Sequence, residues 1–274
     1  MSLNVLSVGG SRNIGYFSAI RLLESGANVT FLLRSPTIFD SDETIQKYVK
    51  LGKARLLEGN ALVREDVQRA WDEAGKESPV DLLLFTVGGT PKFSLTHGFV
   101  ITPSTLVTDC LFNVLATMPK TEPQPRIITI SSTGLTRSSH AALPLPLKPM
   151  YSYLLAAPHK DKVGAERLIR YCAGWPWNAE DGEPDEEIMG PNWKELPGLP
   201  AEGSLKHVLV IRPALLTDGE CKAEKPGKKG PAYRVSEEEL GAWTVSRKDV
   251  AHFIADAVLH RWSEFENKCV SIAY

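Results

Sequence analysis

The chain has 274 residues, 43% hydrophobic and 23% charged, with a formal net charge of −2, which is typical of one globular domain over residues 1–274. Its interspersed charges disfavour a nucleic acid or a membrane as partner, and the lack of a signal-peptide pattern or of an apolar run of about 18 residues favours a cytoplasmic location. Four widely spaced cysteines without a histidine at ligand spacing predict reduced thiols and no metal site: Cys110, Cys172, Cys221 and Cys269.

Residues 3–15 predict a short strand (5–8), a glycine turn and the start of a helix that runs over about 14–25. Glycines let the backbone approach a pyrophosphate, and the helix directs its free N–H groups and positive dipole end at that anion. We therefore predict a nucleotide-phosphate site at Gly9, Gly10, Ser11, Arg12, Asn13, Ile14 and Gly15.

The run from Val8 to Gly15 resembles the Thr-Gly-x-x-x-Gly-x-Gly turn of short-chain dehydrogenases/reductases, with Val8 for the threonine and Asn13 for the middle glycine. Asparagine is the most tolerable replacement, because it accepts left-handed backbone angles better than other residues. The alternative is a tight turn in some other α/β protein. The resemblance implies an α/β doubly wound parallel sheet, the Rossmann fold, with an NAD(P) cofactor.

A second strand over 27–33 is followed at once by Arg34. An acidic residue at the tip of this strand would bind the 2′-hydroxyl of NAD, whereas arginine pairs with the 2′-phosphate of NADP. Arg12 could close on the same phosphate from the other side. We expect NADP(H) to be preferred over NAD(H), unless Arg34 is only a solvated loop residue.

Two further strands end in turns that the resemblance assigns to the cofactor. The strand over 54–61 ends at Asn60 and Ala61, which would lie beside the adenine. The strand over 80–87 is apolar, as expected of a central parallel strand, and would form the cofactor floor with Val87, Gly88 and Gly89. Strands alternate with helices at 42–51 and 63–74, which predicts a parallel sheet with right-handed crossovers.

The fifth strand, over 126–134, follows a loop containing His97 and a helix over 103–118. A lone loop histidine is more often solvated than functional. The strand's Ile-Ser-Ser ending resembles that of the same family. By this resemblance Ser132 is the serine that binds the reacting carbonyl oxygen, with Thr133 as a second candidate.

The family places Tyr-x-x-x-Lys on the next helix, and here only the lysine matches. Lys162 and Glu166 fit the Lys-x-x-x-Glu spacing of the extended branch, which makes Lys162 the ribose ligand, but Pro158 occupies the place of the tyrosine. The segment resembles atypical, fungal relatives near the NmrA-like and biliverdin-reductase-B-like groups. His159 is then the best replacement proton donor, because imidazole titrates nearest neutral pH. Alternatively, Tyr151 or Tyr153 donates the proton. In a third interpretation none of them does, and His159 only caps the start of the helix while Tyr151 and Tyr153 pack.

The C-terminal part is predicted to be rich in loops, and residues 175–243 would form an insertion and the loops on the substrate side of the site. Trp175, Trp177 and Trp193 would line an apolar pocket or pin the loop. A strand over 207–216 would bring three residues to the nicotinamide by resemblance: Pro213, Leu215 and Leu216. Ser246 is expected to cap a helix that Arg247 and Asp249 pin in place, before a last strand over 268–273.

The resemblance, together with these patterns, implies an NADPH-dependent reductase of a small carbonyl, quinone or enone, with Ser132, His159 and Lys162 as catalytic residues. The missing tyrosine keeps a second hypothesis open, an NADP(H)-sensing regulator of the NmrA type. The third hypothesis is an isomerase that requires the cofactor. Neither the substrate nor the oligomeric state follows from the sequence, because a fold does not choose its chemistry.

Overall fold

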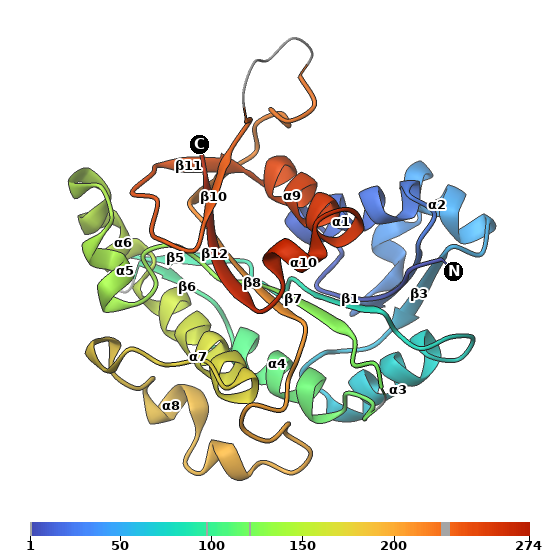
Figure 1. Ribbon diagram of the computed structural model, residues 1–274, viewed down its shortest axis with the longest axis horizontal. Helices are drawn as coiled ribbons and strands as arrows, with labels where there is room; N and C mark the ends of the chain where they lie inside the picture. The colour runs from blue at the N-terminus through green and yellow to red at the C-terminus, as the bar shows by residue number, and fades with distance from the viewer. Residues whose placement is uncertain (1, 97, 121, 226–230) are drawn as a thin grey trace.

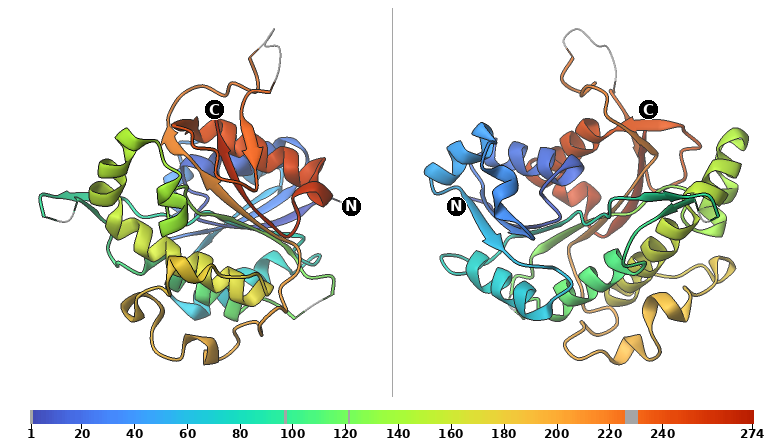
Figure 2. Two further views of the ribbon diagram at one scale, coloured as in Figure 1. Left: turned by 60° about the vertical axis from the view of Figure 1, so that its left-hand side comes forward. Right: turned by 180° about the vertical axis from the view of Figure 1, so that it is seen from behind.

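A twisted sheet of eight strands lies between two layers of helices (Figures 1 and 2). This computed structural model describes residues 2–96, 98–120, 122–225 and 231–274, so His97 lies outside the described residues. The strands of the sheet are β1 (Asn4–Val8), β2 (Asn28–Leu33), β3 (Ala54–Glu58), β4 (Leu82–Phe85), β7 (Arg126–Ile130), β8 (Val208–Pro213), β10 (Arg234–Ser236) and β12 (Lys268–Ala273).

The strand order is β10-β12-β8-β7-β4-β1-β2-β3, and all neighbours are parallel except the edge pair of β10 and β12. The order reverses between β1 and β4, which opens a crevice at the carboxyl ends of these strands. The central strands are mostly apolar and mostly buried on both faces, as helices on both sides require. The predicted doubly wound α/β fold is confirmed.

Each helical layer has its own hydrophobic core. One face carries α1 (Asn13–Glu24), α2 (Glu43–Lys50), α9 (Arg247–Leu259) and α10 (Trp262–Phe265). The other carries α3 (Arg64–Ala74), α4 (Leu106–Ala116), α7 (Ala156–Ala173) and α8 (Glu186–Met189). No described helix is both long enough and apolar enough to cross a membrane.

Several shorter elements lie outside the main sheet. The sequence did not predict the hairpin of β5 (Lys92–Ser94) and β6 (Gly98–Val100), nor α5 (Arg137–Ala141) and α6 (Lys148–Leu154), which follow the fifth strand. A second pair joins β9 (Leu215–Thr217) to β11 (Thr244–Ser246). The 3₁₀ turns are η1 (Pro36–Phe39), η2 (Leu145–Leu147), η3 (Ala179–Asp181) and η4 (Trp193–Glu195).

Side-chain caps fix the ends of the helices that border the crevice. Ser246 accepts the N–H of Asp249 at 2.9 Å, which confirms the cap predicted for α9. The start of α4 is capped from another helix, because the buried Asp161 carboxylate of α7 accepts the N–H groups of Val107 and Thr108, each at 2.8 Å. This contact holds α4 against α7 where both approach the crevice.

The tryptophans of residues 175–204 pin that segment to the outer helices. Trp193 stacks edge-on against Tyr171 of α7 and Phe112 of α4. The Trp177 indole donates to Gly182 O at 2.7 Å, beside the guanidinium of Arg167. This segment therefore covers α4 and α7, and of the two sequence hypotheses for its tryptophans the structure supports pinning.

Candidate active site

The turn from β1 into α1 has the geometry that its glycines and Asn13 predict. Gly9 has a φ of +91°, and a Cβ there would lie 2.5 Å from the backbone of Thr86 and Val87. A Cβ on Gly15 would lie 2.2 Å from Thr86 Oγ1, and one on Gly10 would lie 2.2 Å from Ser7 Oγ. Asn13 has a φ of 56°, so asparagine occupies the left-handed conformation expected of it. The turn is therefore packed tightly against β4.

We expect Gly9→Ala to destabilise the protein more than the matched control Gly26→Ala. Gly26 has nearly the same φ, +93°, but no atom lies within 4 Å of its Cβ position. Both variants bear the left-handed penalty of about 1–2 kcal/mol, and only Gly9→Ala adds the clash with β4. Urea unfolding of the two variants measures the difference. Equal losses would show that the turn tolerates a Cβ.

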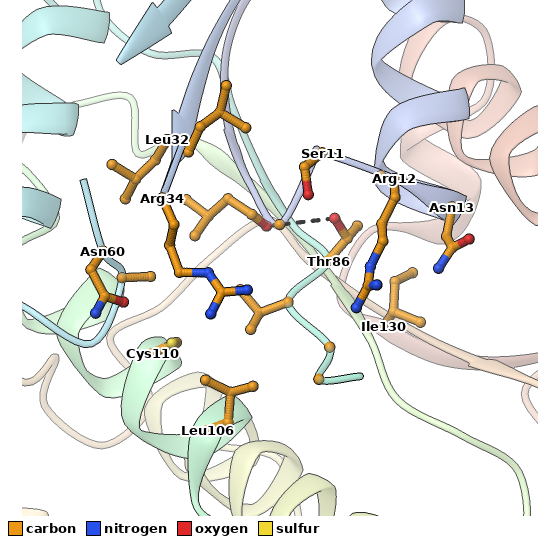
Figure 3. A pocket seen from close by; sticks show the side chains of 18 of the residues that line it. Ser11, Arg12, Asn13, Leu32, Arg34, Asn60, Thr86, Leu106, Cys110 and Ile130 are labelled. Carbon is orange, nitrogen blue, oxygen red and sulfur yellow. Dashed lines mark hydrogen bonds between the residues drawn. The ribbon is translucent and has the colours of Figure 1, made fainter. Parts of the chain in front are cut away.

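A cavity of about 410 Å³ opens at the carboxyl ends of β1, β2 and β4 (Figure 3). Most of the residues predicted to bind the cofactor line it together: Gly9, Ser11, Arg12, Asn13, Ile14, Gly15, Arg34, Asn60, Ala61, Val87, Gly88, Gly89, Lys162 and Leu216. Gly10, Pro213, Leu215, Ser132 and His159 do not line it. The lining also contains residues that sequence reasoning missed: Thr102, Pro103, Leu106, Cys110, Ile130 and Arg247.

Cationic side chains from several elements line this cavity. Arg12 and Arg34 both point into it in Figure 3, and the Arg12 guanidinium donates to Thr90 Oγ1 at 2.7 Å. Lys162 and Arg247 complete the set, and Arg247 forms an ion pair with Asp218 at 2.7 Å. No aspartate or glutamate occurs among the described residues that line the cavity. The cavity is therefore suited to an anion.

The part of the cavity beside Arg34 is lined mainly by apolar side chains. Leu32, Leu106 and Cys110 lie around it, with Asn60 at its edge (Figure 3). The Asn60 side-chain oxygen accepts the N–H of Leu62 at 3.1 Å, and no described residue accepts a hydrogen bond from its amide nitrogen. Burial raises the pKa of the Cys110 thiol to about 12, so this thiol is protonated at neutral pH.

Lys162 and Glu166, one helical turn apart on α7, hold Ser131 at the end of β7. Lys162 Nζ donates to Ser131 O at 3.0 Å, and Ser131 Oγ donates to Glu166 at 2.7 Å. Burial lowers the pKa of Lys162 to about 8, although part of its side chain reaches the cavity. Burial alone would raise the pKa of Glu166, but its ion pairs with Arg212 and Arg170 outweigh burial and lower it.

The predicted proton-transfer residues are not among the described residues that line the cavity. Ser132 is half-buried, and its hydroxyl donates to Thr133 O at 3.1 Å. The His159 ring stacks edge-on against Tyr151 with centroids 5.5 Å apart. Burial, and then the charge of Lys162, lower the pKa of His159 to about 3, so its imidazole is neutral at neutral pH. Tyr151 is only 2% exposed, and burial raises its pKa.

No family model matches the chain. It is 30% identical to the reductase pytE of Aspergillus terreus over 203 residues, which are 71% of this chain and 67% of that protein. A short chain dehydrogenase from Burkholderia cenocepacia, solved in complex with NADP, is 16% identical with a TM-score of 0.57, over 99% of this chain and 96% of that one. An alcohol dehydrogenase from the archaeon Thermococcus sibiricus, complexed with 5-hydroxy-NADP, is 14% identical with a TM-score of 0.55, over 94% and 91%. At these identities the two structures show a shared fold.

Proposed function

The chain belongs to the short-chain dehydrogenase/reductase superfamily of NAD(P)-binding Rossmann proteins, and from this we propose that it is an NADPH-dependent reductase of a small carbonyl, quinone or enone. The observation that carries the proposal is the cavity at the strand ends, lined by four cationic side chains and, among its described lining residues, by no acidic one: Arg12, Arg34, Lys162 and Arg247. NADPH is a dinucleotide with an additional 2′-phosphate, and this charge pattern suits it.

Each part of the cofactor has a proposed partner. The turn at Gly9 and the start of α1 would bind the pyrophosphate. Arg34 and Arg12 would flank the 2′-phosphate, because arginine binds phosphate through two parallel hydrogen bonds. The apolar end beside Asn60 would take the adenine. Val87, Gly88 and Gly89 would then form the floor beneath the nicotinamide half, with Leu216 nearby.

The chain's own residues would bind and orient the reactants. NADPH, when bound, supplies the hydride. Lys162 would hold the nicotinamide ribose through its ammonium group. Ser132 would donate a hydrogen bond to the acceptor oxygen, where negative charge develops. Because the His159 imidazole is neutral, we assign it a second hydrogen bond to that oxygen, and water supplies the proton.

The first test is a titration of the protein with NADPH, NADP⁺ and NADH, followed by tryptophan fluorescence or calorimetry. We expect NADPH to bind at least about 30-fold more tightly than NADH, a difference of about 2 kcal/mol. A panel of aldehydes, quinones and enones is then screened for NADPH oxidation. If none of the three nucleotides binds, the proposed function is wrong.

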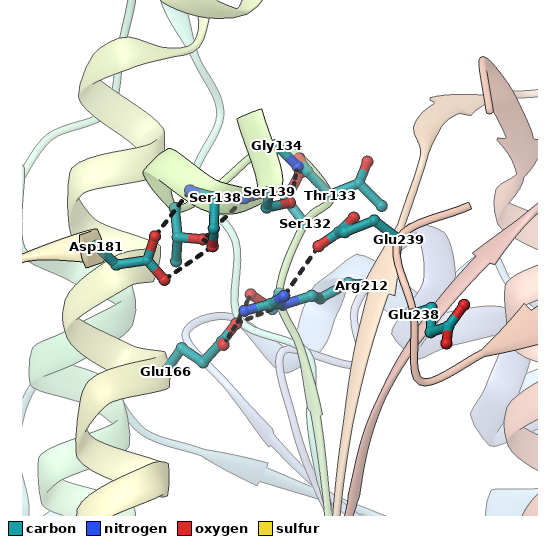
Figure 4. A network of polar contacts seen from close by, with 12 residues as sticks. Ser132, Thr133, Gly134, Ser138, Ser139, Glu166, Asp181, Arg212, Glu238 and Glu239 are labelled. Carbon is teal, nitrogen blue, oxygen red and sulfur yellow. Dashed lines mark hydrogen bonds and ion pairs between the residues drawn. The ribbon is translucent and has the colours of Figure 1, made fainter. Parts of the chain in front are cut away.

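Ser132→Ala is expected to lower kcat about 100-fold, the usual effect of removing one donor to a developing oxyanion. Ser138→Ala is the matched control, because Ser138 is an exposed serine on α5 that bonds Asp181 (Figure 4). NADPH affinity should not change in either variant. Full turnover in both Ser132→Ala and His159→Ala would remove these residues from the mechanism.

A second candidate function is an NADP(H)-sensing regulator of the NmrA type. The observation that favours it is Pro158 in place of the catalytic tyrosine, together with the absence of any tyrosine among the described residues that line the cavity. A regulator would bind NADPH without reducing any compound of the panel. Its protein partners, captured on the immobilised chain, would change when NADPH is added.

A further inference from the structure

A small crevice lies beside the proposed reaction site, at the carboxyl ends of β7, β8 and β12. One wall is the exit of β7 and α5, with Thr133 and Ser139, and its floor includes Ala214 and Ala273. The other wall is the segment 237–243, which we call the strap, with Leu240 and Ala242. The crevice volume is about 10 Å³, about the space that one water molecule needs. A substrate fits there only after the strap moves.

The strap is attached at both ends, and its middle packs Leu240 and Ala242 against the core and carries one ion pair to the sheet. At one end Glu237 pairs with Lys268 at 2.8 Å, and at the other Trp243 O accepts the N–H of Leu215 at 3.2 Å. Glu239 pairs with Arg212 of β8 at 3.0 Å. Within the described parts of the chain, this ion pair is the one contact between a polar side chain of the strap's middle and the sheet, while Ser236 Oγ of β10 accepts the N–H of Glu238 at 3.0 Å.

Arg212 has two carboxylate partners that differ in burial (Figure 4). The Glu166 side chain is 1% exposed and binds the guanidinium through both its oxygens, whereas the Glu239 side chain is 24% exposed. If Glu239 leaves, Arg212 keeps its buried counter-charge, so the ion pair to the strap breaks without stranding a charge in the core. Glu239 is therefore the partner that can be released.

We infer that this crevice is the substrate-binding site of the reductase proposed above, and that the Glu239–Arg212 ion pair controls access to it. The walls are mostly small and apolar, with the hydroxyls of Thr133 and Ser139, so they suit a compact, uncharged, mainly apolar carbonyl compound. A substrate carboxylate would meet Glu239. The assignment of the crevice to a substrate rests on the proposed function, while the opening of the strap does not.

The opening is tested with Glu239→Gln and the matched control Glu238→Gln. Glu238 is the neighbouring glutamate, exposed and directed away from Arg212 (Figure 4). Each variant is also combined with Ala214→Cys, which places a thiol on the buried floor of the crevice. Backbone hydrogen exchange over 239–242 and iodoacetamide labelling of that thiol are followed by mass spectrometry, without cofactor or substrate.

We expect Glu239→Gln to speed both exchange and labelling about tenfold, and Glu238→Gln to leave both unchanged. Added salt should speed them in the wild type and in Glu238→Gln but not in Glu239→Gln, because it screens the same ion pair. Unchanged exchange and labelling in Glu239→Gln would overturn the inference, whether or not the protein is a reductase. Faster opening with an unchanged substrate KM would overturn the assignment of the crevice to a substrate.

Discussion

Replacing Lys162 with methionine is expected to lower kcat/KM for NADPH-dependent reduction by about 100-fold or more. Lys162 lines the cavity, where it donates to Ser131 O at 3.0 Å, and in the proposed binding mode it is the cation at the nicotinamide end. A loss of this size corresponds to about 2.7 kcal/mol of transition-state stabilisation. Methionine keeps the length and apolar body of the side chain and removes the ammonium, so the measured loss reports the charge.

Lys160→Met is the matched control. Lys160 is on the same helix but exposed, and it pairs with Asp185 at 2.8 Å. That variant should keep the wild-type kcat/KM and a circular dichroism melting curve like that of Lys162→Met. If the two variants lose activity equally, the effect comes from α7 as a whole, and the proposed role of Lys162 is wrong.

The same lysine predicts a pH dependence of cofactor binding. Burial lowers the pKa of Lys162 to about 8, so the ammonium is charged below this pH and loses its proton as the pH rises through it. The Kd for NADPH should therefore rise above about pH 8 in the wild type and stay flat in Lys162→Met. Measuring Kd by fluorescence avoids the proton that turnover itself consumes. The Asp185 ion pair raises the pKa of Lys160, so Lys160 stays charged in this range.

The fold and the residues that line the cavity around the first turn could be predicted because their determinants are local in the sequence. Strand, turn and helix follow one another within residues 4–24, and the turn needs glycine or asparagine at positions that steric limits alone identify. Arg34 directly follows β2, so its place at the cavity edge follows from the strand direction. These features need no knowledge of distant contacts.

The contacts of the residues proposed for catalysis were harder to predict. At the end of a strand, the local backbone conformation decides which side chain faces which neighbour. The family-like ending of β7 pointed to Ser132, yet the residue bound by Lys162 and Glu166 is Ser131. Arg247 reaches the cavity from a helix more than 200 residues after the phosphate turn, and no local pattern predicts that approach. The three-residue strands β5 and β6 are too short for an alternating pattern to identify them.

The preference for NADPH over NADH should weaken when Arg12 and Arg34 are replaced by alanine. We expect Arg34→Ala to raise the Kd for NADPH about 30-fold, because one charge-assisted hydrogen-bonded contact contributes about 2 kcal/mol. Arg12→Ala should have a similar effect, and the double variant should lose up to about 1,000-fold if the two contacts are independent. The Kd for NADH, which lacks the 2′-phosphate, should change less than about threefold.

The control is Arg69→Ala on α3, an exposed arginine that pairs with Asp66 at 2.9 Å and does not line the cavity. It should leave both nucleotides unaffected, which excludes a general effect of net charge. Salt should weaken NADPH binding more in the wild type than in the double variant, since fewer ionic contacts remain to be screened. If the affinities for NADPH and NADH fall equally in Arg34→Ala, this arginine binds the pyrophosphate that both nucleotides share, and its assignment to the 2′-phosphate is wrong.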